Sequence, residues 1–248
     1  MEHNIVLAIS YLLTGDNHYQ KPIYLVTVQK NSDVCGCIVC PPPDGLYLTE
    51  LPLEAIPEIT QQLQTKYQTL AQVLGPEKVA TTFAKNWKRQ KWKMHSRQRW
   101  WSLRKVNSLK TVATGSLRKA GNEDIPLVSE WASAFAREVD TKVDAVMVFQ
   151  RMVRRGLLHL WDDDGPRCVI TVSGLTPTAA RISSLYTPPE YRGHGYAANA
   201  VASVSQHILK TGRHLCVALT DINELGPTAI FQSVGYKPGK EFVMIHLD

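Results

Sequence analysis

The sequence has no long uninterrupted apolar run. A membrane-spanning helix needs roughly 20 consecutive apolar residues, and no stretch of the 248 residues reaches that length. The apolar stretch 5–13 is broken by Ser10 and Tyr11, follows Glu2 rather than a basic segment, and lacks a small-residue cleavage site. These features predict neither a membrane anchor nor a secretory signal peptide.

Cysteine is scarce, and its count is odd. Five cysteines in 248 residues do not resemble a secreted disulfide framework, so the reducing cytoplasm is the predicted location. Cys35, Cys37 and Cys40 fall on a predicted strand, where Cys40 faces the opposite side from the other two. Because no further cysteine or histidine lies close by to complete four ligands, we expect small apolar strand residues here and no metal site.

Acidic residues are absent between Lys78 and Asn122, a stretch that holds 13 Lys and Arg residues. The net charge of +6 therefore comes from a basic middle flanked by acidic ends, a distribution that can attract an anion. Segment 85–105 also carries four tryptophans: Trp87, Trp92, Trp100 and Trp101. Three interpretations stay open, namely tryptophans packed inward behind solvated Lys and Arg, a small-anion site, or a surface for single-stranded nucleic acid.

The remaining composition, 44% hydrophobic and 20% charged, is that of a globular protein with one large or two small domains. Apolar patterns predict strands at 23–29, 34–40, 46–49 and 97–106, and helices at 54–74 and 77–90. A segment rich in Ser, Thr, Lys and Gly, 107–121, is the predicted linker, with a domain boundary after residue 113. Beyond it we expect helices from Asn122 and at 143–155, 195–210 and 227–233, and strands at 157–161, 168–172, 181–187, 214–220 and 236–247.

A strand, a two-proline turn, a glycine loop and an alanine-rich helix follow one another over residues 184–198. Gly193 and Gly195 lack Cβ atoms, so their backbone N–H groups can approach a ligand closely. The loop leads into a helix N-terminus, whose first N–H groups and dipole favour a phosphate, and Arg192 adds a positive charge. The pattern predicts a diphosphate held mainly by the backbone.

Two classes of cofactor are bound by loops of this kind. Residues 193–198 formally match the dinucleotide fingerprint, and Asp221 ends the next strand as a ribose-binding acid does. However, six residues separate Tyr186 from Gly193, and only 27 residues follow Asp221, too few for the remaining βαβ units. The chain also lacks a Gly-x-x-x-x-Gly-Lys-Ser/Thr motif. These mismatches favour the other class, coenzyme A.

The loop Arg192-Gly-His-Gly195-Tyr-Ala197 resembles the Arg/Gln-x-x-Gly-x-Gly/Ala loop of the GNAT N-acetyltransferase superfamily. Segment 221–236 resembles the second coenzyme-binding segment of that superfamily, with Phe231, Gly235 and Tyr236 at its end. The resemblance extends to a bacterial branch in which a degenerate GNAT-like half precedes a working one. It implies an α/β (α+β type) fold of two GNAT-like halves, residues 1–113 and 114–248, each with a mixed, mostly antiparallel sheet flanked by helices.

The resemblance also implies an activity, the transfer of acetyl or another short acyl group from coenzyme A to an amine within a ternary complex. The acceptor is a small amine or a protein N-terminus. The coenzyme residues implied are Leu185, Tyr186, Thr187, Arg192, Gly193, His194, Gly195, Tyr196, Ala197, Ala198 and Phe231. Glu138 and Tyr186 are the candidate catalytic residues.

Several alternatives stay open at these positions. The family often has Tyr where this chain has Phe231, and a Phe cannot protonate a leaving thiolate. A non-catalytic acyl-CoA-binding module is therefore the alternative function. Glu138 is either a base or amine-binding carboxylate or a solvated helix residue, and His159 is either a base or a packed strand histidine.

Overall fold

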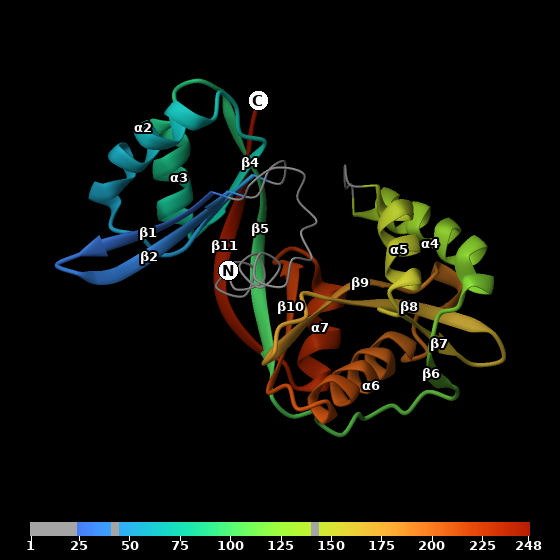
Figure 1. Cartoon of the computed structure of the whole chain (residues 1–248). Coiled ribbons are helices and arrows are strands. Elements are labelled where there is room, and N and C mark those ends of the chain that lie inside the picture. Colours follow the sequence, from blue (N-terminus) through green and yellow to red (C-terminus); the bar gives the residue numbers. More distant parts are fainter. Residues whose placement is uncertain (1–23, 41–44, 140–143) are drawn as a thin grey trace. The chain divides into compact units, whose positions relative to one another are not determined.

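The computed structural model describes residues 24–40, 45–139 and 144–248, so the apolar stretch 5–13 lies outside the described residues. The chain forms two compact units (Figure 1). Of the described residues, one unit contains those up to Arg99 together with residues 221–223 and 240–248, and the other contains those of 100–220 and 224–239. The predicted division after residue 113 into a degenerate and a working half stays a prediction. The chain passes from the first compact unit to the second between Arg99 and Trp100.

The first unit is a sheet with helices α2 (Ile56–Lys66) and α3 (Glu77–Asn86) packed on one face. Its strands, in order across the sheet, are β1 (Tyr24–Lys30), β2 (Asp33–Cys40), β3 (Leu46–Leu48), β4 (Gln72–Gly75), the later part of β11 (Lys237–Leu247) and residues 92–99 of β5 (Trp92–Leu103). Val79 and Phe83 recur one helical turn apart on α3, and both are buried. Strand β4 pairs parallel to β3 and antiparallel to β11.

The helix predicted over 54–74 is too long. Helix α2 ends at Lys66, Tyr67 is already extended, and β4 begins at Gln72. Leu70 and Val73 continue the helical spacing but are buried outside a helix, Val73 on the strand. The Gln90 side chain accepts from the Leu70 backbone N–H at 2.9 Å, which stabilises this extended path. Because both conformations bury the same side chains, apolar spacing alone could not separate them.

The basic segment 85–105 contains the end of α3 and all of β5 (Trp92–Leu103), which begins five residues before the predicted strand. Trp87 and Trp101 are fully buried. The basic side chains are paired in part, because Arg97 binds Glu77 at 2.5 Å and Arg99 binds Glu241. This arrangement favours the interpretation in which the segment packs tryptophans inward, although Trp92 is 38% exposed.

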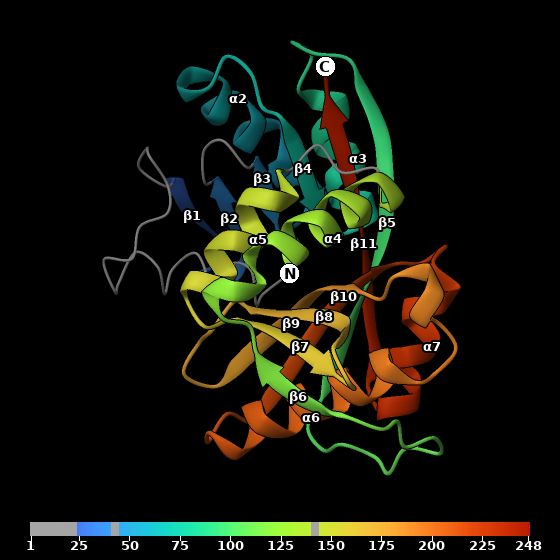
Figure 2. The same ribbon diagram turned by 90° about the vertical axis from the view of Figure 1, so that its right-hand side faces the viewer.

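The second unit is a sheet with helices on both faces. Its strands, in spatial order, are residues 100–103 of β5, then β10 (Leu215–Asp221), β9 (Ala179–Tyr186), β8 (Pro166–Ser173), β7 (Leu158–Asp162) and β6 (Ser116–Lys119). Helices α4 (Ile125–Glu138) and α5 (Ala145–Arg154) cover one face, and α6 (Tyr196–Lys210) and α7 (Leu225–Val234) cover the other (Figure 2). The mixed, mostly antiparallel α/β architecture predicted from the sequence is confirmed.

The predicted linker 107–121 is structured in part. It contains strand β6, and the backbone N–H of Asn107 donates to the Val234 carbonyl at 2.9 Å. The Asn199 side chain donates to the Thr111 carbonyl at 3.1 Å. The segment therefore packs on the second unit, although its polar composition is typical of a loop.

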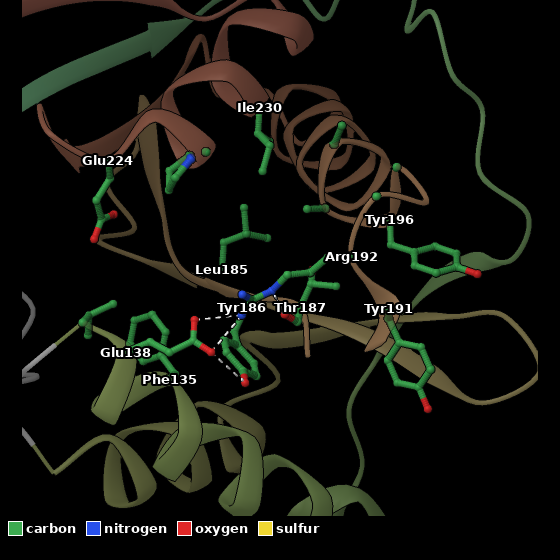
Figure 3. A pocket seen from close by; sticks show the side chains of 17 residues that line it. Phe135, Glu138, Leu185, Tyr186, Thr187, Tyr191, Arg192, Tyr196, Glu224 and Ile230 are labelled. Atoms are coloured by element: carbon green, nitrogen blue, oxygen red, sulfur yellow. Dashed lines mark hydrogen bonds and ion pairs between the residues drawn. The ribbon is translucent and has the colours of Figure 1, made fainter. Parts of the chain in front are cut away.

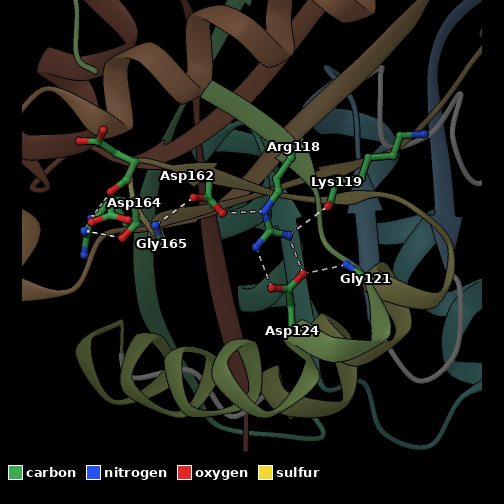
Figure 4. A network of polar contacts seen from close by, with 9 residues as sticks. Arg118, Lys119, Gly121, Asp124, Asp162, Asp164 and Gly165 are labelled. Atoms are coloured by element: carbon green, nitrogen blue, oxygen red, sulfur yellow. Dashed lines mark hydrogen bonds and ion pairs between the residues drawn. The ribbon is translucent and has the colours of Figure 1, made fainter. Parts of the chain in front are cut away.

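Arg118 on β6 fixes the beginning of α4. Its Nη1 and Nη2 atoms donate to the two carboxylate oxygens of Asp124 at 2.7 and 2.9 Å, and its Nε donates to Asp162 at 2.7 Å (Figure 4). Asp124 is almost fully buried and also accepts from the Gly121 backbone N–H. The hydrogen bond from Arg118 lowers the pKa of Asp124. This network positions the helix whose last residue is Glu138.

All five cysteines are free, and no group of three potential metal-binding side chains occurs within 24–40, 45–139 and 144–248. In the same residues, no helix has both the length and the apolar character needed to cross a bilayer.

Candidate coenzyme and acceptor site

Strands β9 and β10 diverge in the middle of the second unit. Their parallel pairing comprises Ala179–Leu215, Ala180–Cys216 and Arg181–Val217. Beyond these pairs β9 continues to Tyr186 and β10 to Asp221. The divergence exposes the later backbone groups of β9 along one side, where an extended ligand can pair with them as an added strand does.

A bulge lies in β9 at this opening. Val169 pairs with Tyr186 and Thr171 pairs with Ser183, so β9 contains one residue more than β8 over this interval. Ser184, within the bulge, has a φ of 47°. A non-glycine residue with a left-handed φ is a strained conformation that clusters at functional sites. The bulge turns local backbone groups out of the regular ladder.

The glycine loop follows β9 after the short helix η3 (Pro189–Tyr191). Gly193 has a φ of 84° and Gly195 one of 82°, both in the left-handed region that glycine adopts without steric cost. Gly195 is the N-cap of α6, so the N–H groups of the first turn of α6 have no partner within the helix. A Cβ atom added at Gly193 would meet no atom within 4 Å, so the loop is open at this point.

The opening and the loop border one cavity of about 550 Å³, which lies within the second unit (Figure 3). Its walls come from the end of α4, the end of β9, the glycine loop, the start of α6 and the start of α7. The lining residues are Phe135, Glu138, Val139, Leu185, Tyr186, Thr187, Tyr191, Arg192, Gly193, Gly195, Tyr196, Ala197, Ala198, Glu224, Gly226, Pro227 and Ile230.

Three polar side chains meet inside the cavity. Nη2 of Arg192 lies 2.8 Å from each carboxylate oxygen of Glu138, and Nε of Arg192 donates to the Thr187 carbonyl at 2.9 Å. The Tyr186 hydroxyl donates to Oε1 of Glu138 at 3.4 Å. Burial, followed by the negative charge of Glu138, raises the pKa of Tyr186. Tyr186 therefore keeps its proton at neutral pH.

The hairpin between β7 and β8 supports the other end of the cavity. The Tyr196 hydroxyl donates to Asp163 at 2.7 Å, and the guanidinium of Arg167 lies 4.6 Å from the centre of the Tyr191 ring. Hydrogen bonds from Thr114 and Tyr196 lower the pKa of Asp163. These contacts hold the aromatic residues on both sides of the glycine loop.

The structure brings together most of the residues predicted from the sequence. All of the predicted site residues line the cavity except His194 and Phe231. His194 lies in the loop with its ring stacked against that of Tyr196. Phe231 is 4% exposed and packs against Trp101 and Tyr236, with ring centroids 6.5 and 5.0 Å away. Its side chain thus belongs to the core beneath the cavity.

Sequence reasoning missed part of the lining, which comprises Phe135, Val139, Tyr191, Glu224, Gly226, Pro227 and Ile230. Phe135 lies one helical turn before Glu138, the candidate catalytic residue, and Val139 follows it directly, so sequence spacing was an available signal. Glu224 to Ile230 lie in the second resembling segment, but nothing in the sequence shows which side of α7 faces the cavity.

His159 lies on β7, outside the cavity lining. The side chain is 7% exposed, and burial lowers its pKa to about 4. The imidazole is therefore neutral at physiological pH, which fits the packed-histidine alternative.

Comparisons with known proteins agree with this geometry. Residues 172–243 match the family model described as FR47-like protein. No curated protein matches the chain at a significant level. A GCN5-related N-acetyltransferase from Kribbella flavida superposes with a TM-score of 0.64 at 14% identity, over 97% of this chain and 95% of that one.

Two further solved structures show the same fold. A GCN5-related N-acetyltransferase from Sphaerobacter thermophilus gives a TM-score of 0.64 at 12% identity, over 96% of this chain and 85% of that one. A tandem GNAT protein from the clavulanic acid biosynthesis pathway gives 0.56 at 13% identity, over 95% and 86%. These solved structures share the fold of this chain, which is the fold that the resemblance in the sequence implied.

Proposed function

We propose that the chain transfers a short acyl group, acetyl in the first instance, from coenzyme A to an amine within a ternary complex. One observation carries the proposal. The divergence of β9 from β10, the glycine loop and the first turn of α6 all border the same cavity. Backbone pairing groups for an extended arm and backbone donors for a diphosphate are thus available to a single ligand.

The residues present fit coenzyme A. The open side of Gly193 leaves room beside the main chain, and the free N–H groups at the start of α6 suit the diphosphate. Leu185 and Thr187, at the end of β9, would pair with the pantetheine arm. The bound coenzyme supplies a thioester, whose carbonyl carbon is the electrophile.

Two side chains of the cavity are assigned to proton movement. Tyr186 keeps its proton at neutral pH, and we assign its hydroxyl to donate a proton to the departing sulfur as the carbon–sulfur bond breaks. We assign Oε1 of Glu138, 3.4 Å from that hydroxyl, to bind the incoming amine, to accept the proton that the amine loses and to return a proton to Tyr186. Phe231 has no part in this step, because its ring is in the core.

The test measures acetyl-CoA binding by calorimetry and release of the coenzyme thiol with a panel of amines. We expect binding, and transfer to at least one amine. Gly195→Glu places a carboxylate at the diphosphate site and is expected to abolish binding. Gly212→Glu makes the same change at another left-handed glycine outside the cavity lining. Tight binding without transfer to any amine would instead support an acyl-CoA-binding module.

A further inference from the structure

The charges that line the cavity limit what the acceptor can be. Among the described lining residues, the charged side chains are Glu138, Arg192 and Glu224. Glu138 and Arg192 form an ion pair, with both carboxylate oxygens 2.8 Å from Nη2. Whatever Glu224 itself contacts, these described side chains leave at most one negative charge unbalanced. Such a site does not match a polycation.

An acceptor carboxylate fits this site poorly. Among the lining residues that the structure describes, the cation that could receive it is Arg192, whose Nη2 already binds Glu138 and whose Nε binds Thr187. A second carboxylate on the same guanidinium would lie close to that of Glu138. Two like charges about 5 Å apart in a partly solvated site weaken binding by a factor of about 100.

The acceptor end of the cavity is the part formed by Phe135, Glu138, Val139 and Glu224. Apart from the two carboxylates, the side chains there are apolar. Phe135, Glu138 and Glu224 lie away from Tyr191 and Tyr196, which flank the glycine loop, and Leu185 and Ile230 point into the space between (Figure 3). Phe135 packs edge-on against Tyr186, with ring centroids 6.3 Å apart. Val139, 38% exposed, follows Glu138 at the end of α4. These side chains favour an apolar body on the acceptor.

We propose that the acceptor is a primary amine with an apolar body, a single positive charge and no carboxylate. This inference rests on the acyl transfer proposed above. The amine nitrogen approaches the thioester from the end of α4, with its apolar body against Phe135, Val139 and Ile230.

The test uses the full chain, acetyl-CoA and acceptors matched in shape. 2-Phenylethylamine is compared with phenylalanine, and 3-methylbutylamine with leucine, so that each pair differs by one carboxylate, and spermidine represents polycations. Thiol release and product mass give kcat/KM for each. We expect kcat/KM to be at least tenfold higher for each monoamine than for its carboxylated partner or for spermidine.

A second variant pair tests the charge count directly. Val139→Asp adds a carboxylate to the acceptor end, and Val139→Asn adds a side chain of the same shape without charge. For each variant we take the ratio of kcat/KM for 1,5-diaminopentane to kcat/KM for 3-methylbutylamine. We expect this ratio to be about tenfold higher in the Asp variant than in the Asn variant.

The outcomes separate the two proposals. Transfer that prefers phenylalanine, leucine or spermidine, or an identical amine preference in both Val139 variants, would overturn the acceptor class and leave acyl transfer standing. Transfer to other amines of the panel but to none of these would also overturn the acceptor class alone. Acetyl-CoA binding without transfer to any amine of the panel would overturn both proposals.

Discussion

Gly193→Ala separates the conformational role of the glycine loop from its role in binding. Gly193 has a φ of 84°, and an added Cβ would meet no atom within 4 Å, so the substitution brings strain without a clash. A left-handed residue other than glycine costs about 1–2 kcal/mol. The chain either bears this cost or relaxes to a negative φ, which turns the following N–H group away from the cavity.

Gly212→Ala is the matched control. Gly212 has a φ of 90°, also has nothing within 4 Å of an added Cβ, and does not line the cavity. Both variants should therefore lose about 1–2 kcal/mol of stability, which lowers the melting temperature by about 2–8 °C in a chain of this size. Stability alone cannot distinguish the two substitutions.

Coenzyme affinity should distinguish them. A hydrogen bond to a charged group contributes about 1.5–3 kcal/mol, and 1.4 kcal/mol is a factor of ten in affinity. Loss of one backbone donor to the diphosphate should raise the Kd for acetyl-CoA by about 10- to 100-fold in Gly193→Ala and leave it unchanged in Gly212→Ala. Equal Kd values for the two variants, measured by calorimetry, would refute the assignment of the loop.

Three further predictions concern single side chains. Tyr186→Phe should lower kcat by about 100-fold, the lower end for loss of a general acid, and should leave the Kd for acetyl-CoA unchanged. Because the pKa of Tyr186 is raised, the activity of the wild-type protein should fall only at strongly alkaline pH. This alkaline fall should be absent in the variant. Phe231→Tyr should destabilise the protein by about 1–3 kcal/mol by burying a hydroxyl without raising kcat, and a gain in kcat would show that this side chain reaches the cavity. Asp124→Asn should lower the free energy of unfolding by about 1–3 kcal/mol at pH 7. Since the pKa of Asp124 is lowered in the folded state, the stabilisation by its carboxylate is present above about pH 4 and is lost as the pH falls below it. Urea unfolding at pH 3 should therefore show a smaller difference between the wild-type protein and the variant.

The sequence contains enough local information to predict most of the second unit. The strand, glycine loop and helix over 184–198 appear where expected because turn residues and helix starts are encoded over a few positions. The 54–74 helix was wrong in its second half because Leu70 and Val73 are buried by either a helix or a strand. Only tertiary contacts decide between the two.

The cavity was harder to predict than the loop. The Glu138–Arg192 pair joins residues 54 positions apart, and no local pattern specifies such a contact. The bulge in β9 was equally invisible, because Ser184 has no sequence signature of a left-handed residue. The position of Phe231 in the core depends on the orientation of α7, which only its packing against Trp101 and Tyr236 establishes.

The last strand has a consequence for how the chain is synthesised. Residues 240–248, which comprise the later part of β11 and Asp248, belong to the first unit, where Asp248 and Lys91 exchange backbone hydrogen bonds at 2.8 and 2.9 Å. The amino-terminal part of the chain is therefore synthesised before residues 240–248, which its sheet needs to be complete. Chains truncated before residue 240 should leave an unsatisfied sheet edge along β4 and be prone to aggregate.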